Sequence, residues 1–156
     1  MDLKNKPKEL WELNPYGKVP VLVDGEVVVY ESAIINEYLD ERFPQHPLMP
    51  KDLGPRARAR IWIDFCNSRL QAAGSEVVHG SDPEKAREKL TEHLRTLDRE
   101  MARRTYIVGD YSLADVTYVP FFTRQQRYGV TIDERLPNVK RWVERLLDRP
   151  AVKSTL

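Results

Sequence analysis

Hydrophobic and polar positions follow one pattern near the start of the chain and another along the rest. Two β-branched runs, residues 19–23 and 26–30, are separated by Asp24-Gly25, a dipeptide typical of a two-residue hairpin turn. After Ser32 the period changes to 3.6, because a helical stripe ended by Pro44 is formed by Ile34, Ile35, Tyr38, Leu39 and Phe43. The pattern predicts a β-hairpin followed directly by a helix.

The segments on either side of this unit are shorter and less regular. Residues 5–13 predict a short helix with Asn5 as its cap, Pro7 in its first turn, and Leu10 and Leu13 on one side. Residues 45–55 contain three prolines and one glycine with little apolar periodicity. We interpret them as a linker between two domains.

From Arg56 onward every pattern is helical. Apolar stripes include Ile61, Trp62, Phe65, Cys66 and Leu70 in one helix, and Leu90, Leu94, Leu97 and Met101 in the next. Ser112 and Asp115 have the spacing of a capping box, and a last helix runs from Pro137 to its expected stop at Pro150. The expected fold class is therefore α+β to mostly α, with an α+β portion in residues 1–44, the linker, and an all-helical domain in residues 56–156.

Charge and cysteine content narrow the range of partners. Lys and Arg number 25 against 24 Asp and Glu, so the net charge of +1 gives no general attraction to nucleic acid or to an anionic membrane. No apolar run approaches the ~18 residues that span a bilayer, and no secretory leader is recognisable. The single cysteine, Cys66, excludes an intramolecular disulfide. We expect a cytoplasmic protein that binds neither nucleic acid nor membrane.

A candidate binding segment lies around the hairpin. Glu31 and Ser32 stand where the following helix begins, and the free N–H groups and positive dipole end of a helix favour a bound carboxylate. Taken alone, Ser32 is better explained as an ordinary N-cap, and Lys18 as a solvated lysine. The Val19-Pro20 bond is either cis or part of an edge strand.

Three motifs in this order resemble the glutathione transferase family. They are NPYGKVPVLVDGEVVVYESAIINEYLDERFP (residues 14–44), VGDYSLADV (residues 108–116) and LPNVKRWVERLLDRPAV (residues 136–152). The resemblance implies a partial thioredoxin-like portion followed by the family's helical C-terminal domain. It also implies that glutathione is the ligand.

The resemblance assigns a role to each residue of the candidate site. Val19 would precede a cis-proline, Pro20, and its backbone would pair with the cysteinyl unit of glutathione. Glu31 would face the ammonium group and Ser32 the carboxylate of the γ-glutamyl end. Lys18 would neutralise the glycyl carboxylate.

The chain departs from the family at its start. Family members begin with a strand, a helix and a second strand, and this segment carries the Tyr, Ser or Cys that activates the glutathione thiol; Met1 falls after it. No other residue takes that role by motif, so the catalytic residue is unknown. We expect Cys66 to be a core thiol. We expect the tyrosine hydroxyls to belong to packing residues, at Tyr16, Tyr30, Tyr106 and Tyr118.

Three interpretations follow. The first is a transferase that conjugates glutathione to a small electrophile. The second is a non-catalytic binding or regulatory module that makes protein contacts, as in stringent starvation protein A and elongation factor gamma subunits. The third is a natural or engineered truncation whose helical domain still folds.

Two further expectations concern partners and metals. An isolated hairpin is marginal in water, so we expect its open edge to be covered by a rearranged N-terminal segment or by another chain, and we expect a homodimer. Metal-ligand spacing is absent among His46, His79, His93 and Cys66, so we expect no metal site.

Overall fold

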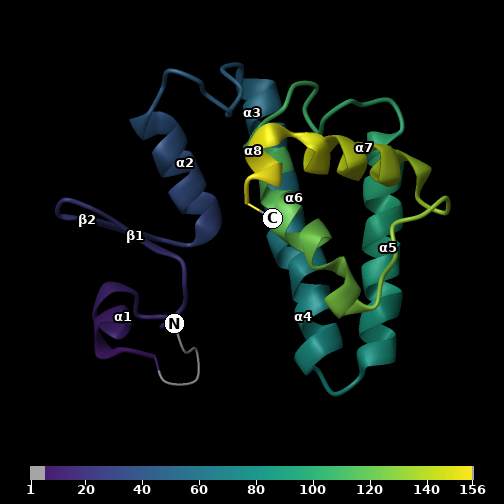
Figure 1. Ribbon diagram of the computed structural model, residues 1–156, viewed down its shortest axis with the longest axis horizontal. Coiled ribbons are helices and arrows are strands. Elements are labelled where there is room, and N and C mark those ends of the chain that lie inside the picture. Colours follow the sequence, from purple (N-terminus) through teal and green to yellow (C-terminus); the bar gives the residue numbers. More distant parts are fainter. Residues whose placement is uncertain (1–5, 156) are drawn as a thin grey trace. The chain divides into compact units, whose positions relative to one another are not determined.

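The computed structural model describes residues 6–155 of the chain (Figure 1). The chain divides into two compact units, Met1–Pro47 and Leu48–Leu156. We call them the small unit and the helical unit. Within residues 6–155, none of the helices has the length and apolar character needed to cross a membrane.

The small unit contains the expected hairpin. β1 (Val21–Asp24) pairs antiparallel with β2 (Val27–Tyr30), and they form the two-stranded sheet of the described chain. The turn differs by one residue from the prediction, because Asp24 pairs with Val27 and the loop is Gly25-Glu26. Gly25 has a φ of 61°, in the left-handed region that glycine adopts without steric cost. Asp24 is thus a strand residue.

A helix lies on either side of the hairpin in the sequence. α1 (Lys8–Leu13) is short, as expected, with Pro7 at its N-cap position instead of in its first turn, and the proposed cap Asn5 lies outside the described residues. Leu10 is buried, whereas Leu13 is exposed. The stripe expected along these nine residues is therefore only partly buried.

The second helix, α2 (Ser32–Arg42), is tied to the hairpin by polar contacts. Its Tyr38 hydroxyl donates to Asp24 Oδ2 at 2.8 Å, and Arg42 Nε lies 3.2 Å from the same oxygen. These contacts lower the pKa of Asp24, the Tyr38 hydrogen bond most. Of the expected stripe, Ile35 is buried and Ile34 is exposed. α2 is therefore positioned by its polar side chains as well as by its apolar ones.

The helical unit agrees with the expected all-helical architecture. Its elements are α3 (Leu53–Phe65), the π-helix η1 (Cys66–Gln71), α4 (Ala72–His79), α5 (Pro83–Met101), α6 (Leu113–Thr123), the 3₁₀-helix η2 (Gln125–Tyr128), α7 (Pro137–Asp148) and α8 (Pro150–Lys153). One boundary was predicted wrongly, because α3 begins at Leu53, inside the segment interpreted as linker. α7 ends before Pro150 as expected, and Pro150 also begins α8, which was not predicted. The fixed φ of proline fits the first turn of a helix.

One apolar core fills the helical unit. Its largest fully buried side chains include Leu70, Leu90, Leu94, Leu97, Met101, Tyr118, Phe121, Phe122, Trp142 and Leu146. The ring of Trp142 packs edge to face on Tyr118 and Phe122, with centroids 5.1 and 5.5 Å apart. Ile61 was predicted to lie on the same apolar helix stripe as Leu70, but it is 64% exposed.

Asp115 joins α6 to the rest of this core. It forms the predicted capping box with Ser112, whose backbone N–H donates to Asp115 Oδ2 at 3.0 Å. Its Oδ1 accepts hydrogen bonds from the Ile107 N–H at 3.1 Å and from Trp142 Nε1 at 2.9 Å. Burial raises the pKa of the Asp115 carboxyl, and these hydrogen bonds oppose that shift. The predicted cap therefore also connects α6 to α7.

Candidate functional site

The register of the hairpin brings the expected site residues to one end of the sheet. Val21 opens β1 and pairs with Tyr30, which closes β2. Lys18, Val19 and Pro20 lead into that pair, and Glu31 and Ser32 follow it. Residues separated by eleven or more positions in the sequence thus converge at one end of the small unit, beside the start of α2.

Asn14 holds the loop that carries Lys18. Its side chain is 1% exposed, its Nδ2 donates to the Lys18 carbonyl at 2.8 Å, and its Oδ1 accepts from the Tyr16 N–H at 2.9 Å. The helix expected over residues 5–13 ends just before Asn14, and no binding role was predicted for this residue. The available signal was an Asn at the start of a turn, where its side chain readily bonds to the backbone two residues on.

Gly17 allows the same loop to turn sharply. Its φ is 57°, and a Cβ at this position would lie 2.4 Å from ring atoms of Trp11. A larger residue would therefore clash with the indole as well as adopt an unfavourable backbone conformation. Trp11 and Asn14 together fix the path of the chain into Lys18 and Val19.

The Val19-Pro20 peptide bond is cis, as the family resemblance implies. The Val19 side chain is 47% exposed. Among the described residues, neither backbone hydrogen-bonding group of Val19 has a partner. An unpaired, exposed backbone at the entrance to a strand can accept a second extended peptide.

Glu31 has an unusual backbone conformation. Its φ is 69°, and within residues 6–155 it is the one non-glycine residue with a positive φ. Such a conformation costs about 1–3 kcal/mol and is found mainly where function requires it. Glu31 occupies the N-cap position of α2, and its carbonyl accepts the first helical hydrogen bond, from the Ile35 N–H at 2.9 Å. Its side chain is left exposed and unpaired within the described chain.

The interpretation of Ser32 as an ordinary N-cap is wrong. Ser32 is the first residue of α2, and no side chain of the described residues caps this helix. The strained Glu31 takes the cap position and carries no capping hydrogen bond, so the N–H groups of the first turn remain available. The Ser32 side chain is exposed beside them.

These groups suit a small peptide with opposite charges at one end. The first turn of α2 and the Ser32 hydroxyl can donate to a carboxylate, and the Glu31 carboxylate can accept from an ammonium group. The Val19 backbone can pair with a peptide unit, and the exposed Lys18 can neutralise a second carboxylate. The arrangement of these groups therefore suits the binding and orientation of such a peptide.

Two candidates for thiol chemistry are placed in the core instead. Cys66 is fully buried, and burial raises the pKa of its thiol to about 12. The Tyr118 hydroxyl is buried and donates to the Trp62 carbonyl at 2.8 Å. Both side chains are packing residues, as expected. Among residues 6–155, no group of three His, Cys, Asp or Glu side chains is placed to hold a metal ion.

Comparisons with known proteins agree with this architecture. The model of the glutathione S-transferase N-terminal domain matches residues 1–47, and that of the C-terminal domain matches residues 65–150. Glutathione S-transferase U19 of Arabidopsis thaliana is 32% identical, over 99% of this chain and 75% of its own. A stringent starvation protein A homolog of Coxiella burnetii is also 32% identical, over 100% of this chain and 77% of its own.

A solved structure supports the same assignment. The glutathione S-transferase of Methylobacillus flagellatus KT with GSH bound is 29% identical and superimposes with a TM-score of 0.82, over 94% of this chain and 79% of its own. Its similarity extends across both units, as do the two domain models together. The chain belongs to the glutathione S-transferase family.

Proposed function

We propose that this chain binds glutathione through Lys18, Val19, Pro20, Glu31 and Ser32. The observation that carries the proposal is the strained Glu31 at the uncapped start of α2. Backbone strain of about 1–3 kcal/mol persists only where the surrounding structure fixes the conformation, and such residues cluster at ligand-binding and active sites. The relative solved with GSH bound adds support, because it is 29% identical to this chain.

Each part of the tripeptide has a partner in this proposal. The γ-glutamyl carboxylate accepts from the Ser32 hydroxyl and the first-turn N–H groups of α2, and the ammonium group pairs with Glu31. The cysteinyl unit pairs with the Val19 backbone in strand-like fashion, next to Pro20. The glycyl carboxylate lies against Lys18.

Calorimetric titration of the 156-residue chain with reduced glutathione tests this site. Ser32→Ala removes one hydrogen bond to a charged group, so we expect the dissociation constant to rise about tenfold. Ser75→Ala is the matched control, because Ser75 is exposed on α4 in the other unit, and it should leave binding unchanged. The absence of heat at millimolar glutathione, or equal binding by both variants, would refute the proposal.

We further propose a transferase reaction with a small electrophile as the use of the bound glutathione. In that reaction the thiolate attacks an electrophilic carbon, a C–S bond forms, and a leaving group such as chloride departs. A chloronitrobenzene substrate reports the product by its absorbance. Turnover that Ser32→Ala reduces and Ser75→Ala preserves is the expected result.

A protein-contact module is the second candidate. Similarity to the stringent starvation protein A homolog favours it, as do exposed apolar side chains of the small unit, among them Val23, Val27, Ile34 and Phe43. For such a module, Ser32→Ala would have no effect on function, and purified chain would give no turnover with the electrophile. The same two assays therefore separate the candidates.

We also propose that the chain forms a homodimer. The outer edges of β1 and β2 are unpaired within the described residues, and a two-stranded sheet is marginal by itself. A second copy would cover this surface. Light scattering during size-exclusion chromatography should give twice the chain mass of 18.2 kDa, and a monomeric mass at micromolar concentration would refute this proposal.

A further inference from the structure

A hollow lined by arginines lies in the helical unit. Its lining residues come from the segment after α5 and from α7, and Figure 1 shows the end of α5 beside α7. Its volume is about 260 Å³, and its polar lining is Arg103, Arg104, Thr105, Asn138, Arg141 and Arg145. Neither Asp nor Glu contributes to the lining. We call it the arginine hollow.

The arginines come from two segments that are distant in the sequence. Arg103 and Arg104 follow the last residue of α5, and Arg141 and Arg145 lie one turn apart on α7, so they share a helix face. Arg145 Nη1 donates to the Thr105 carbonyl at 2.8 Å and thereby joins the two segments. Tertiary packing therefore creates this concentration of charge.

Three of the four arginines have no carboxylate partner in the described chain. Arg141 donates only to the neutral Asn138 Oδ1, at 2.7 Å, and Arg145 binds a backbone carbonyl and lies over the Tyr106 ring. Arg103 is exposed and makes no hydrogen bond or ion pair with residues 6–155. Only Arg104 is neutralised, with its Nε 2.9 Å from Glu100.

The nearby acidic side chains are already engaged. Glu100 is shared with Arg58, and it therefore offers no charge to the other arginines. Asp98 on α5 accepts from the backbone N–H groups of Asn138 and Val139 at 2.8 and 2.9 Å, and from Asn138 Nδ2 at 2.9 Å. Asp98 and Glu100 carry two negative charges against the four arginines of the lining and Arg58, so the hollow keeps an excess of positive charge.

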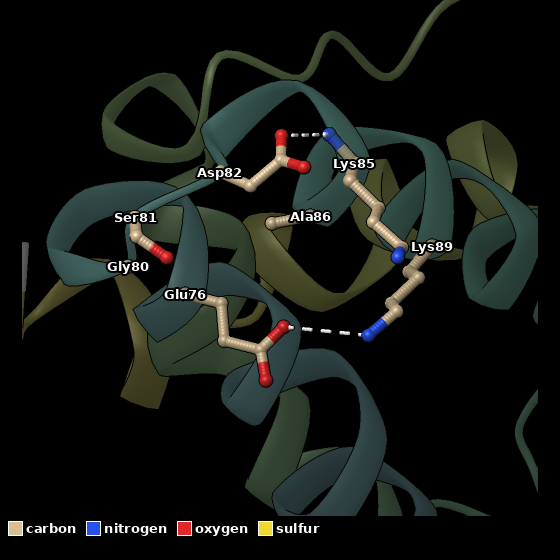
Figure 2. Close-up of a pocket in the computed structure, with 7 residues that line it drawn as sticks. All are labelled: Glu76, Gly80, Ser81, Asp82, Lys85, Ala86 and Lys89. Carbon is tan, nitrogen blue, oxygen red and sulfur yellow. Dashed lines mark hydrogen bonds and ion pairs between the residues drawn. The ribbon is translucent and has the colours of Figure 1, made fainter.

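A second hollow in the helical unit also contains cationic side chains, but acidic side chains accompany them. It lies at the turn between α4 and α5 and has a volume of about 300 Å³. Figure 2 shows the residues that line it. There Glu76 pairs with Lys89 at 3.8 Å, and the Asp82 carboxylate accepts from the Lys85 N–H at 3.1 Å. Acidic side chains balance the cations in that hollow, whereas they are missing from the lining of the arginine hollow.

We propose that the arginine hollow binds a small molecule carrying two or more oxyanion charges, of the phosphorylated class. The planar guanidinium group binds phosphate oxygens in a bidentate fashion, and several such groups converge here without a competing carboxylate. The volume suits a small anionic group more than a long strand. The arginine hollow belongs to the helical unit and the proposed glutathione site to the small unit, so the two proposals share no residue and this one does not depend on glutathione binding.

A nucleic acid is a poorer match for this surface. Binding of single strands normally uses aromatic rings on which bases stack. The nearby Tyr106 ring already packs edge to face on Tyr111 at 5.4 Å and beneath Arg145 at 5.8 Å. Stacking of a base on Tyr106 would have to displace these contacts.

Calorimetric titration of the full chain with inorganic pyrophosphate, at ionic strength held constant with potassium chloride, tests the proposal. We expect saturable binding at one site. Arg103→Gln with Arg141→Gln should raise the dissociation constant at least about tenfold, because hydrogen bonds between charged groups are lost. Arg124→Gln with Arg127→Gln is the matched control, because both residues are exposed elsewhere in the helical unit and the same charge is removed; binding should stay within about twofold.

Amide NMR of the unmodified chain gives a readout that does not depend on the variants. Pyrophosphate should shift the backbone signals of Thr105 and Asn138 most, and it should leave that of Ser81, at the opposite end of α5, unchanged. Shifts spread evenly over the surface, equal weakening in both double variants, or no saturation by millimolar pyrophosphate would overturn the proposal. Tighter binding of a single-stranded oligonucleotide than of pyrophosphate at the same ionic strength would also overturn it.

Discussion

The two units of this chain use their apolar residues in opposite ways. All of the largest fully buried side chains belong to the helical unit, among them Leu70, Trp142 and Leu146. In the described part of the small unit only Leu10 and Ile35 are buried apolar residues, whereas Trp11, Val23 and many similar side chains are exposed. The helical unit has a core of its own, and the small unit mainly displays groups to the outside.

This difference separates stability from binding. Burial of apolar surface is the dominant favourable contribution to folding, at roughly 25 cal/mol per Å², so most of the folding free energy belongs to the helical unit. The proposed glutathione site lies wholly in the small unit, where Glu31 keeps an unfavourable backbone conformation. Backbone strain at a binding residue persists when the residues packed around it fix its conformation.

The sharpest test of the contrast is thiol labelling. With its pKa raised to about 12, Cys66 should react with a thiol reagent at pH 8 more than about a thousandfold more slowly than in urea-unfolded chain. A cysteine at exposed Val23, in a Cys66→Ala background, should react at the unfolded rate. Rapid labelling of Cys66 in the native chain would show that the helical core opens readily.

Asp115→Ala should give the largest loss of stability. The substitution removes the capping box and leaves Trp142 Nε1 and the Ile107 N–H buried without an acceptor, so we expect about 3 kcal/mol or more to be lost in urea unfolding. Asp110→Ala, at an exposed carboxylate nearby, should cost under about 0.5 kcal/mol. Similar losses in both variants would contradict the role of Asp115 in joining the helices.

Glu31→Gly should stabilise the start of α2 while weakening glutathione binding. Glycine adopts a φ of 69° without strain, so we expect the opening free energy of the Ile35 amide, measured by hydrogen exchange, to rise by about 1 kcal/mol. Glu31→Gln keeps a side chain at this position and should leave it unchanged. A gain in both, or in neither, would argue against backbone strain at Glu31.

The smallest effect concerns the hairpin tip. Hydrogen bonds from Tyr38 and then Arg42 lower the pKa of Asp24 below its ordinary value of 3.8. The resulting stabilisation is present above that ordinary value and is lost as the pH falls through the lowered one. In an NMR pH titration, Tyr38→Phe should move the pKa of Asp24 upward, and Tyr30→Phe should not. An unchanged value in Tyr38→Phe would mean that the contact does not persist in solution.

Local signals in the sequence determined much of this architecture. The change of period from two to 3.6 located the hairpin and α2, and the Ser112–Asp115 spacing located the start of α6. The motif around Lys18, Val19, Glu31 and Ser32 identified the family. Such features depend on the backbone preferences and alternation of neighbouring residues, which a single sequence displays directly.

Only the tertiary structure decided the remaining features. They depend on residues that are far apart in the sequence, or on the backbone conformation of a single residue. Exposure of Ile61 reflects which side of α3 the other helices cover, and the positive φ of Glu31 left no trace in its residue type. The arginine hollow brings together Arg103, in the segment after α5, and Arg141 on α7. A local pattern can show that a residue is helical, but only packing shows what that residue faces.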